Sequence, residues 1–252
     1  MSNNSTTRFS NRVEDYVKYR PSYPDAIVHW LETEFSVSEN MIIADIGSGT
    51  GISSDLFLRN NYKIIGVEPN KEMREMSIRL LSNNPHFKAI EGTAEATNLP
   101  DDSVDVIIAG QAFHWFDRQK TRIEFDRVLR KQGLFVLIWN ERLTSSEFEK
   151  EYDQLIIKHG SDYVKVDHRN TDQQSIDSFF YPQTCHLKIF PNQQVFDFDG
   201  LKGRLLSSSY MPSVDDTGYT AMIDDLQSLF TKYNDKGKIV ISYDAKVYAG
   251  II

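Results

Sequence analysis

The sequence predicts an α/β fold in which helices cover both faces of a mostly parallel sheet. Short apolar runs rich in β-branched residues alternate with amphipathic segments between residues 41 and 139. The first run, Met41 to Ile46, is nearly continuous, as expected of a strand buried on both faces. It leads into a glycine-rich turn, Gly47 to Gly51, at the kind of sheet edge where doubly wound folds bind ligands.

Length, charge and cysteine content limit the function classes. The chain has 252 residues, which suits one α/β domain with small additions. A formal net charge of -8 argues against broad electrostatic attachment to nucleic acid or to an anionic membrane. The single cysteine, Cys185, excludes an intramolecular disulfide, and the histidines show no metal-ligand spacing, so no metal is expected. Without an apolar signal core or a bilayer-length apolar run, a cytoplasmic protein is expected.

The N-terminal region is expected to form two helices at residues 9–35. Aromatic and charged residues interleave at helical spacing from Phe9 to Arg20. The prolines of Arg20-Pro-Ser-Tyr-Pro24 end this first helix, because proline cannot continue the helical donor pattern. A second helix is expected from Asp25 to Phe35, ahead of the first strand.

Strand and helix patterns then alternate regularly up to residue 139. After the first strand, further strands are expected at 62–67, 86–90, 104–109 and 133–139. The helices between them are expected at 52–60, 70–81 and 118–130. Asn70 is the expected N-cap of the second of these helices, and Met73, Met76 and Leu80 form its predicted apolar stripe.

The pattern changes after residue 140. An acidic helix is expected at 147–159, followed by a polar stretch with weak periodicity at 160–174. The remaining segments predict strands at 184–190 and 238–249 and helices at 198–208 and 219–233. We therefore expect one domain over residues 1–252, with a ligand-binding core at 41–139 and cap and variable elements at 140–237.

The three alternating glycines are suited to binding a ligand through the backbone. Gly47, Gly49 and Gly51 stand where a strand turns into a helix, and glycine permits positive φ and close ligand approach. The dinucleotide fingerprint G-x-G-x-x-G is incomplete, because Ile52 occupies its last position. Asp45 would repel a pyrophosphate, whereas it would hold an ammonium group by a charge-assisted hydrogen bond. The loop therefore favours a ligand with a positive charge.

The stretch Asp45-Ile-Gly-Ser-Gly-Thr-Gly51 resembles motif I of the class I S-adenosylmethionine-dependent methyltransferases. Glu68-Pro69 follows the second strand, where that family has an acid that binds ribose, and Glu91 to Pro100 resembles its G-x-A-E-x-L-P pattern. The resemblance implies a Rossmann-like sheet of seven strands in the order 3-2-1-4-5-7-6, with the last strand antiparallel. It also implies S-adenosylmethionine as cofactor, with the following candidate contacts: Asp45, Gly47, Ser48, Gly49, Gly51, Glu68, Pro69, Met73, Thr93, Ala94, Glu95 and Gln111.

A second resemblance concerns the side of the site where the methyl acceptor would bind. The stretch Gln111-x-x-His114-Trp115-Phe116-Asp117 is similar to the trans-aconitate methyltransferase-like subset of methyltransferase type 11. This similarity implies that His114 and Trp115 contact the acceptor, although the aromatic pattern alone slightly favours a core position for Trp115. His114 is the candidate catalytic proton acceptor if the reacting group carries a proton; a carboxylate acceptor needs none.

Two further segments resemble the same subset. Tyr16 and Arg20 correspond to a lid over the cofactor, and a surface helix with aromatic packing explains them equally well. In the segment Leu201 to Pro212, Arg204 and Tyr210 are candidates for closing the acceptor pocket, with solvent exposure as the alternative. The subset includes enzymes that methylate small carboxylic acids, and arginine suits bidentate binding of a carboxylate.

The sequence thus predicts an S-adenosylmethionine-dependent methyltransferase that acts on a small-molecule acceptor, with a carboxylic acid as the acceptor class that the subset suggests. A non-catalytic protein that binds S-adenosylmethionine or S-adenosylhomocysteine would carry the same cofactor motifs. A nicotinamide-dependent oxidoreductase would share the sheet and Glu68, although Asp45 and Ile52 count against it. No nucleic-acid or membrane partner is expected, and the acceptor, its reacting atom and the oligomeric state stay open.

Overall fold

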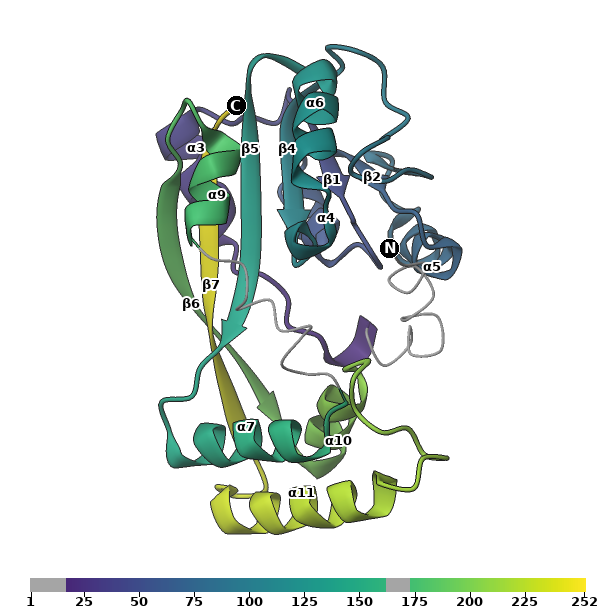
Figure 1. Ribbon diagram of the computed structural model, residues 1–252, viewed down its shortest axis with the longest axis vertical. Helices are drawn as coiled ribbons and strands as arrows, with labels where there is room; N and C mark the ends of the chain where they lie inside the picture. Colours follow the sequence, from purple (N-terminus) through teal and green to yellow (C-terminus); the bar gives the residue numbers. More distant parts are fainter. Residues whose placement is uncertain (1–16, 162–172) are drawn as a thin grey trace.

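The computed structural model describes residues 17–161 and 173–252, which build a seven-stranded sheet in the order β3-β2-β1-β4-β5-β7-β6 (Figure 1). The first five strands are parallel, and β7 is antiparallel to both of its neighbours. This confirms the expected strand order. The strands are β1 (Ile42–Ile46), β2 (Lys63–Val67), β3 (Phe87–Ile90), β4 (Val104–Gly110), β5 (Leu129–Arg142), β6 (His186–Phe196) and β7 (Ile239–Ile251).

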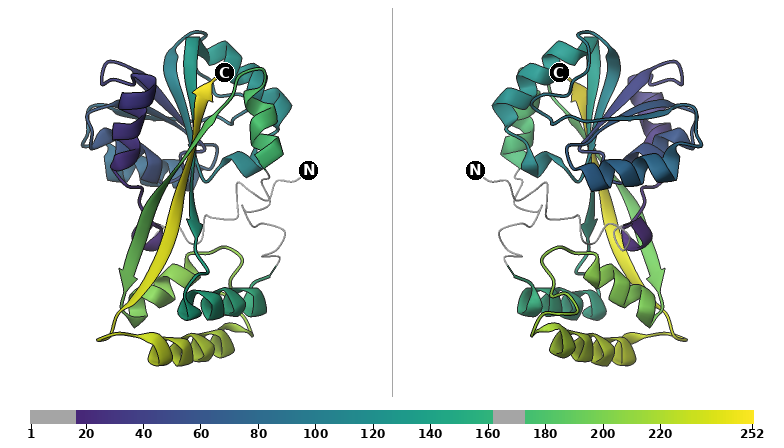
Figure 2. Two further views of the ribbon diagram at one scale, coloured as in Figure 1. Left: turned by 90° about the vertical axis from the view of Figure 1, so that its left-hand side faces the viewer. Right: turned by 90° about the vertical axis from the view of Figure 1, so that its right-hand side faces the viewer.

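Helices cover both faces of the sheet (Figure 2). Two of them, α3 (Ala26–Phe35) and α4 (Ile52–Leu58), pack on one face, while α6 (Arg118–Val128) and α9 (Gln173–Phe180) pack on the other. Successive residues of a strand point to opposite faces, so Ile43 belongs to the first core and Ala44 to the second. Because both faces of β1 are buried, its sequence shows a continuous apolar run instead of an alternation.

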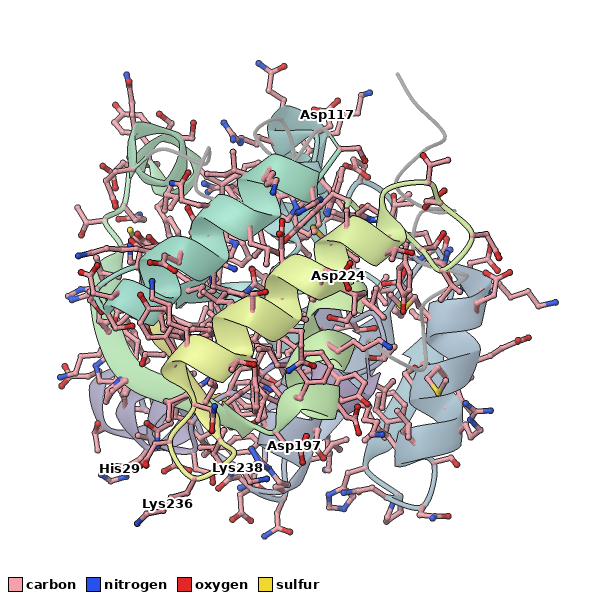
Figure 3. All side chains as sticks on the ribbon, turned by 90° about the horizontal axis from the view of Figure 1, so that it is seen from below. His29, Asp117, Asp197, Asp224, Lys236 and Lys238 are labelled. Carbon is pink, nitrogen blue, oxygen red and sulfur yellow. The ribbon has the colours of Figure 1, made fainter. Side chains whose placement is uncertain are left out.

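A third core lies beyond the carboxyl ends of the central strands. Residues 239–242 of β7 are in register with β6 alone, so this pair of strands extends past β5. Its end packs with α7 (Glu147–His159), α10 (Phe198–Leu206) and α11 (Tyr219–Tyr233), at the end of the molecule toward which β4 and β5 point. Figure 3, seen from that end, labels Lys238, whose ammonium lies 3.3 Å from the Asp197 carboxylate at the start of α10.

Several boundaries and one packing assignment differ from the sequence prediction. Met73 and Met76 of α5 (Lys71–Leu81) are buried, but Leu80 is 44% exposed, because the last turn of the helix lies beside a four-residue edge strand, β3. β6 continues through Pro191, which an edge strand tolerates because no ladder hydrogen bond is lost on its outer side. α6 ends at Val128, and β5 starts at the next residue and runs to Arg142.

In the described part of the chain, no helix combines the length and the apolar character that a bilayer crossing requires.

Glu149 joins the start of α7 to β7. One carboxylate oxygen accepts the backbone N–H groups of Ser145 and Ser146 at 3.0 Å, and the other accepts the N–H of Ser242 at 3.1 Å. The residue also completes a capping box with Ser146, and only 2% of its surface is exposed. Desolvation alone would raise the pKa of Glu149, but the hydrogen bonds outweigh it and hold the pKa at about 2.

We predict that Glu149→Gln lowers the free energy of unfolding at pH 7 by about 2 kcal/mol or more, because an amide cannot accept all of these hydrogen bonds. The folded pKa lies below that of the unfolded chain, so the contribution of Glu149 is present above about pH 4.5 and is lost as the pH falls toward 2. Urea unfolding at pH 7 and pH 4 measures this. Glu147→Gln, an exposed change on the same helix, is the control; equal stability losses in the two variants would refute the assignment.

Candidate active site

A pocket opens at the carboxyl ends of β1, β2 and β4, the edge of the sheet where the sequence places its motifs. The turns that follow these three strands meet there with the loop that follows β3. The lining residues are Gly47, Gly49, Glu68, Pro69, Asn70, Met73, Thr93, Ala94, Glu95, Gly110, Gln111, Ala112, Trp115 and Phe116. The topology therefore brings together residues from four separate turns, as expected of a ligand site in a doubly wound fold.

The three glycines of the first turn all have positive φ, but they differ in what a side chain at each position would contact. A Cβ atom on Gly47 would lie 2.7 Å from the Cβ of Ala112, and one on Gly51 would lie 2.4 Å from a methyl group of Leu81. Gly49 has no neighbouring atom within 4 Å of that position. Gly47 and Gly51 thus permit close packing of the turn, while Gly49 leaves open space on its pocket side.

Glu68 is held firmly at the pocket wall. Its two carboxylate oxygens accept the backbone N–H groups of Gly49 and Asn70, each at 2.8 Å. Only 7% of the surface of Glu68 is exposed. Desolvation by this burial is the largest influence on the pKa of Glu68 and raises it. Each oxygen keeps a further lone pair, so a ligand with two adjacent hydroxyl groups has two fixed acceptors there.

Asp45 lies at the end of β1 beneath the glycine turn and is fully buried. One of its oxygens, Oδ1, receives no hydrogen bond from the described residues. The hydroxyl of Ser48 lies 2.9 Å from where a Cβ of Gly66 would stand, so this side chain faces β2 instead of the pocket. A buried carboxylate with an unused acceptor suits a cationic group of a ligand.

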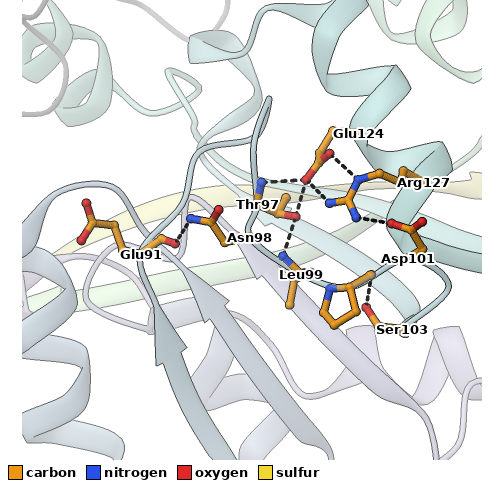
Figure 4. Close-up of polar contacts among 9 residues, drawn as sticks. Glu91, Thr97, Asn98, Leu99, Asp101, Ser103, Glu124 and Arg127 are labelled. Carbon is orange, nitrogen blue, oxygen red and sulfur yellow. Dashed lines mark hydrogen bonds and ion pairs between the residues drawn. The ribbon is translucent and has the colours of Figure 1, made fainter.

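A hydrogen-bonded cluster supports the loop that carries Thr93, Ala94 and Glu95. Glu124 of α6 accepts the Thr97 backbone N–H at 2.7 Å and the Thr97 hydroxyl at 2.5 Å, and Arg127 donates to both carboxylate oxygens (Figure 4). Desolvation would raise the pKa of Glu124, but these bonds outweigh it and hold the pKa at about 2. The loop is thereby fixed on α6.

Trp115 also lines the pocket. Its side chain is 42% exposed, so the interpretation of Trp115 as a core aromatic is wrong. The short 3-10 helix η2 (Phe113–Trp115) explains the difference, because it buries Phe113 in the core and leaves the next two residues outside it. The ring of His114 lies 4.7 Å from that of Trp115, but His114 is not among the residues that line the pocket.

Known proteins resemble this chain in sequence and in fold. Residues 44–137 match the family model described as "Methyltransferase domain". An uncharacterized methyltransferase of Schizosaccharomyces pombe is 36% identical over 60% of this chain and 59% of its own length, and one of Mycobacterium bovis is 32% identical over 60% of each chain. Residues 44–137 are thus similar to a methyltransferase domain. It is aligned to about 60% of the length of these curated relatives.

The fold comparison extends beyond the methyltransferase domain. A solved structure from Anaeromyxobacter dehalogenans, assigned as a type II methyltransferase, has a TM-score of 0.69 and covers 92% of this chain and 98% of its own. At 23% identity this likeness concerns the fold alone. It shows that the elements after residue 137 also follow an arrangement known from a solved protein.

The structure gathers most, though not all, of the predicted site residues of the methyltransferase domain at the pocket. Asp45 and Ser48 lie beneath the loop, and Gly51 packs on α5. Four further predicted site residues do not line the pocket: Arg20, His114, Arg204 and Tyr210. Tyr16 is not among the residues that the structure describes. The described residues contain no group of three or more His, Cys, Asp or Glu side chains placed to hold a metal.

Asn140, which sequence reasoning missed, connects the pocket to the N-terminal segment. Its backbone carbonyl accepts a hydrogen bond of 3.1 Å from the side chain of Gln111, a pocket residue with a φ of 56°. Its side-chain amide donates to the Ser22 carbonyl at 3.1 Å, and its Oδ1 accepts from Asn192, which donates to Ser22 as well. The residue is 4% exposed. Asn140 therefore positions Gln111 and the segment before α3 together.

We predict that Asn140→Ala weakens S-adenosylhomocysteine binding about fivefold or more and lowers the free energy of unfolding by about 1–3 kcal/mol. The reason is that the change removes the side-chain hydrogen bonds that join the end of β5 to the Ser22 carbonyl and to Asn192, so the backbone carbonyl that fixes Gln111 is held less firmly. Calorimetric titration and urea unfolding measure the two effects. Asn192→Ala removes the bonds of Asn192 to Ser22 and to the Asn140 side chain but keeps the bond from Asn140 to Ser22, so its ligand affinity should stay near wild type. Equal affinity losses in both variants would contradict the role assigned to Asn140.

Proposed function

We propose that this protein transfers the methyl group of S-adenosylmethionine to a small molecule that carries a carboxylate. The observation that carries the proposal is the pocket that brings together the fixed carboxylate of Glu68, the open backbone of Gly49 and the part-exposed ring of Trp115. Glu68 would provide hydrogen-bond acceptors for ribose, and Trp115 would provide an apolar surface for the methyl acceptor. The similarity of residues 44–137 to a methyltransferase domain supports methyl transfer as the reaction.

The chain needs to supply alignment more than reactive groups. S-adenosylmethionine, when bound, provides a methyl group already activated on a sulfonium. In-line attack then requires that the acceptor lone pair faces the methyl carbon and that water is kept out. Glu68 would hold the ribose, the loop with Ala94 would hold adenine, and Asp45 would accept the ammonium group. Trp115 would shield the reacting atoms on the acceptor side.

Arg204 supports a carboxylate as the feature that the acceptor carries. Its guanidinium donates to the Tyr243 hydroxyl at 3.2 Å and to the hydroxyls of Ser208 and Ser207 at 3.4 and 3.5 Å. No described carboxylate forms an ion pair with it. Arg20 of the N-terminal segment donates to the Ser207 carbonyl at 3.1 Å. Two guanidinium groups thus meet at the end of α10, and a carboxylate on the acceptor would find charge-assisted hydrogen-bond donors there.

His114 has a conditional role in this proposal. A carboxylate attacks a methyl group without losing a proton, so a carboxylic acid acceptor leaves His114 with no catalytic task. A phenol or an amine would need a proton acceptor, and His114 is the side chain next to Trp115 that could take the proton.

We predict that Arg204→Gln raises the KM for a carboxylic acid acceptor roughly tenfold or more and leaves kcat within a few-fold, since it removes a charge-assisted contact to the acceptor. A panel of small di- and tricarboxylic acids, phenols and amines, assayed by transfer of a labelled methyl group, first identifies the acceptor used. Unchanged S-adenosylhomocysteine affinity shows that the variant is folded.

Arg118→Gln is the matched control, because it removes the same charge from the start of α6, where the guanidinium lies 5.6 Å from the Phe113 ring, instead of from the end of α10. Its KM should equal that of the wild type. Methyl transfer to phenols or amines but not to acids, or an unchanged KM in Arg204→Gln, would refute the carboxylate acceptor.

A further inference from the structure

The buried carboxylate of Asp45 uses its two oxygens very differently. Oδ2 accepts hydrogen bonds from the hydroxyls of Ser53 and Ser54, at 2.7 and 2.6 Å. Oδ1 has no hydrogen-bond partner among residues 17–161 and 173–252 and is out of contact with water. An unused acceptor on a fully buried carboxylate is costly unless a donor arrives from elsewhere. The arrangement therefore leaves Oδ1 available to accept a hydrogen bond from a ligand.

The two serines are placed by the first turn of α4. Gly51, the N-cap of this helix, offers no side-chain cap, and the hydroxyls of the second and third helical residues turn toward β1. Both serines are buried, at 4% and 0% exposure. A hydroxyl donates only one proton, so each serine uses its single donor on Oδ2. Neither can also satisfy Oδ1.

Within residues 17–161 and 173–252, no positively charged group balances the charge of Asp45. Its neighbours in the sheet are Gly66 on β2 and Ile108 on β4, which bring no charge. The charged group that interacts with it from the end of β2 is another carboxylate, Glu68. The phenol of Tyr23, from the N-terminal segment, reaches the position of Gly110 next to Ser53. Asp45 is thus an incompletely compensated negative charge beside the glycine turn.

We propose that Ser53 and Ser54 are positioning residues that keep Asp45 ionised beneath the glycine turn and leave its Oδ1 without a competing donor, so that its charge attracts the ammonium group of the cofactor. This inference rests on the proposed function. By donating to Oδ2, the serines stabilise the charged form and leave one acceptor for the ligand. Burial raises the pKa of Asp45 to about 6, and the serine hydrogen bonds oppose that rise. Ligand affinity should therefore fall as the pH drops below about 6, where Asp45 becomes protonated.

Calorimetric titration between pH 5 and 8.5 with two ligands tests the inference. S-adenosylhomocysteine carries the ammonium group, whereas 5′-methylthioadenosine has the adenosine part alone. The ratio of the two affinities isolates the ammonium contact, because any titration of Glu68 affects both ligands equally. In the wild type, this ratio should fall with decreasing pH, with a midpoint near 6. In Ser54→Ala, a midpoint raised by about one pH unit would lower S-adenosylhomocysteine affinity at pH 6 about fivefold.

The controls separate positioning from general packing. Ser54→Thr keeps the hydroxyl and should restore the wild-type midpoint, and Ser53→Ala should shift it in the same direction as Ser54→Ala. Ser77→Ala, a buried serine of α5 that bonds the Arg74 carbonyl, should leave it unchanged. An unshifted midpoint in both alanine variants, or equal losses for the two ligands, would overturn the inference while the proposed function stands. Failure of the wild type to bind either ligand would overturn both.

Discussion

The hydrogen bond from the Gly49 backbone to the Glu68 carboxylate is the contact on which the site depends. It spans 2.8 Å and joins the turn after β1 to the end of β2. The other oxygen of Glu68 accepts the N–H of Asn70, whose side chain in turn caps α5 by accepting the N–H of Met73. One carboxylate therefore fixes the glycine turn, the start of α5 and one wall of the pocket. Without this carboxylate, the glycine turn, the end of β2 and the start of α5 would lose the hydrogen bonds that hold them together.

The same arrangement places an excess of negative charge at the carboxyl edge of the sheet. Asp45 and Glu68 are both buried, and neither forms an ion pair within the described part of the chain. Burial raises the pKa of each, which shows that the fold bears a cost to keep them charged. Such a cost is typical of a binding site more than of a core. A ligand that combines an ammonium group with a ribose would compensate one carboxylate and use the free lone pairs of the other.

Local sequence signals predicted most of the fold. Asn70 as N-cap, the acidic helix at 147–159 and the helix at 219–233 follow from caps and periodicity, and the structure shows them at those residues. The glycine turn and Glu68 were found because motif and strand pattern coincide. Leu80 was misassigned because periodicity does not tell how far the sheet extends beside a helix.

Residues that act through distant contacts escaped prediction. Asn140 bonds a carbonyl 118 positions away, and Glu124 bonds Thr97 across 27 positions. No local pattern marks either residue, because each is defined by the segment that the topology brings beside it. Trp115 was ambiguous for a related reason: a short 3-10 helix decides which of three consecutive aromatic positions enters the core.

The most direct test of the central claim is calorimetric titration of the wild type and of Glu68→Gln with S-adenosylmethionine, with NADH in parallel. The account predicts saturable binding of S-adenosylmethionine that NADH does not match. It also predicts that Glu68→Gln weakens this binding about tenfold or more, because the amide disrupts the contact to Gly49 and removes a ribose acceptor. No binding of S-adenosylmethionine, tighter binding of NADH, or an unchanged affinity in Glu68→Gln would contradict it.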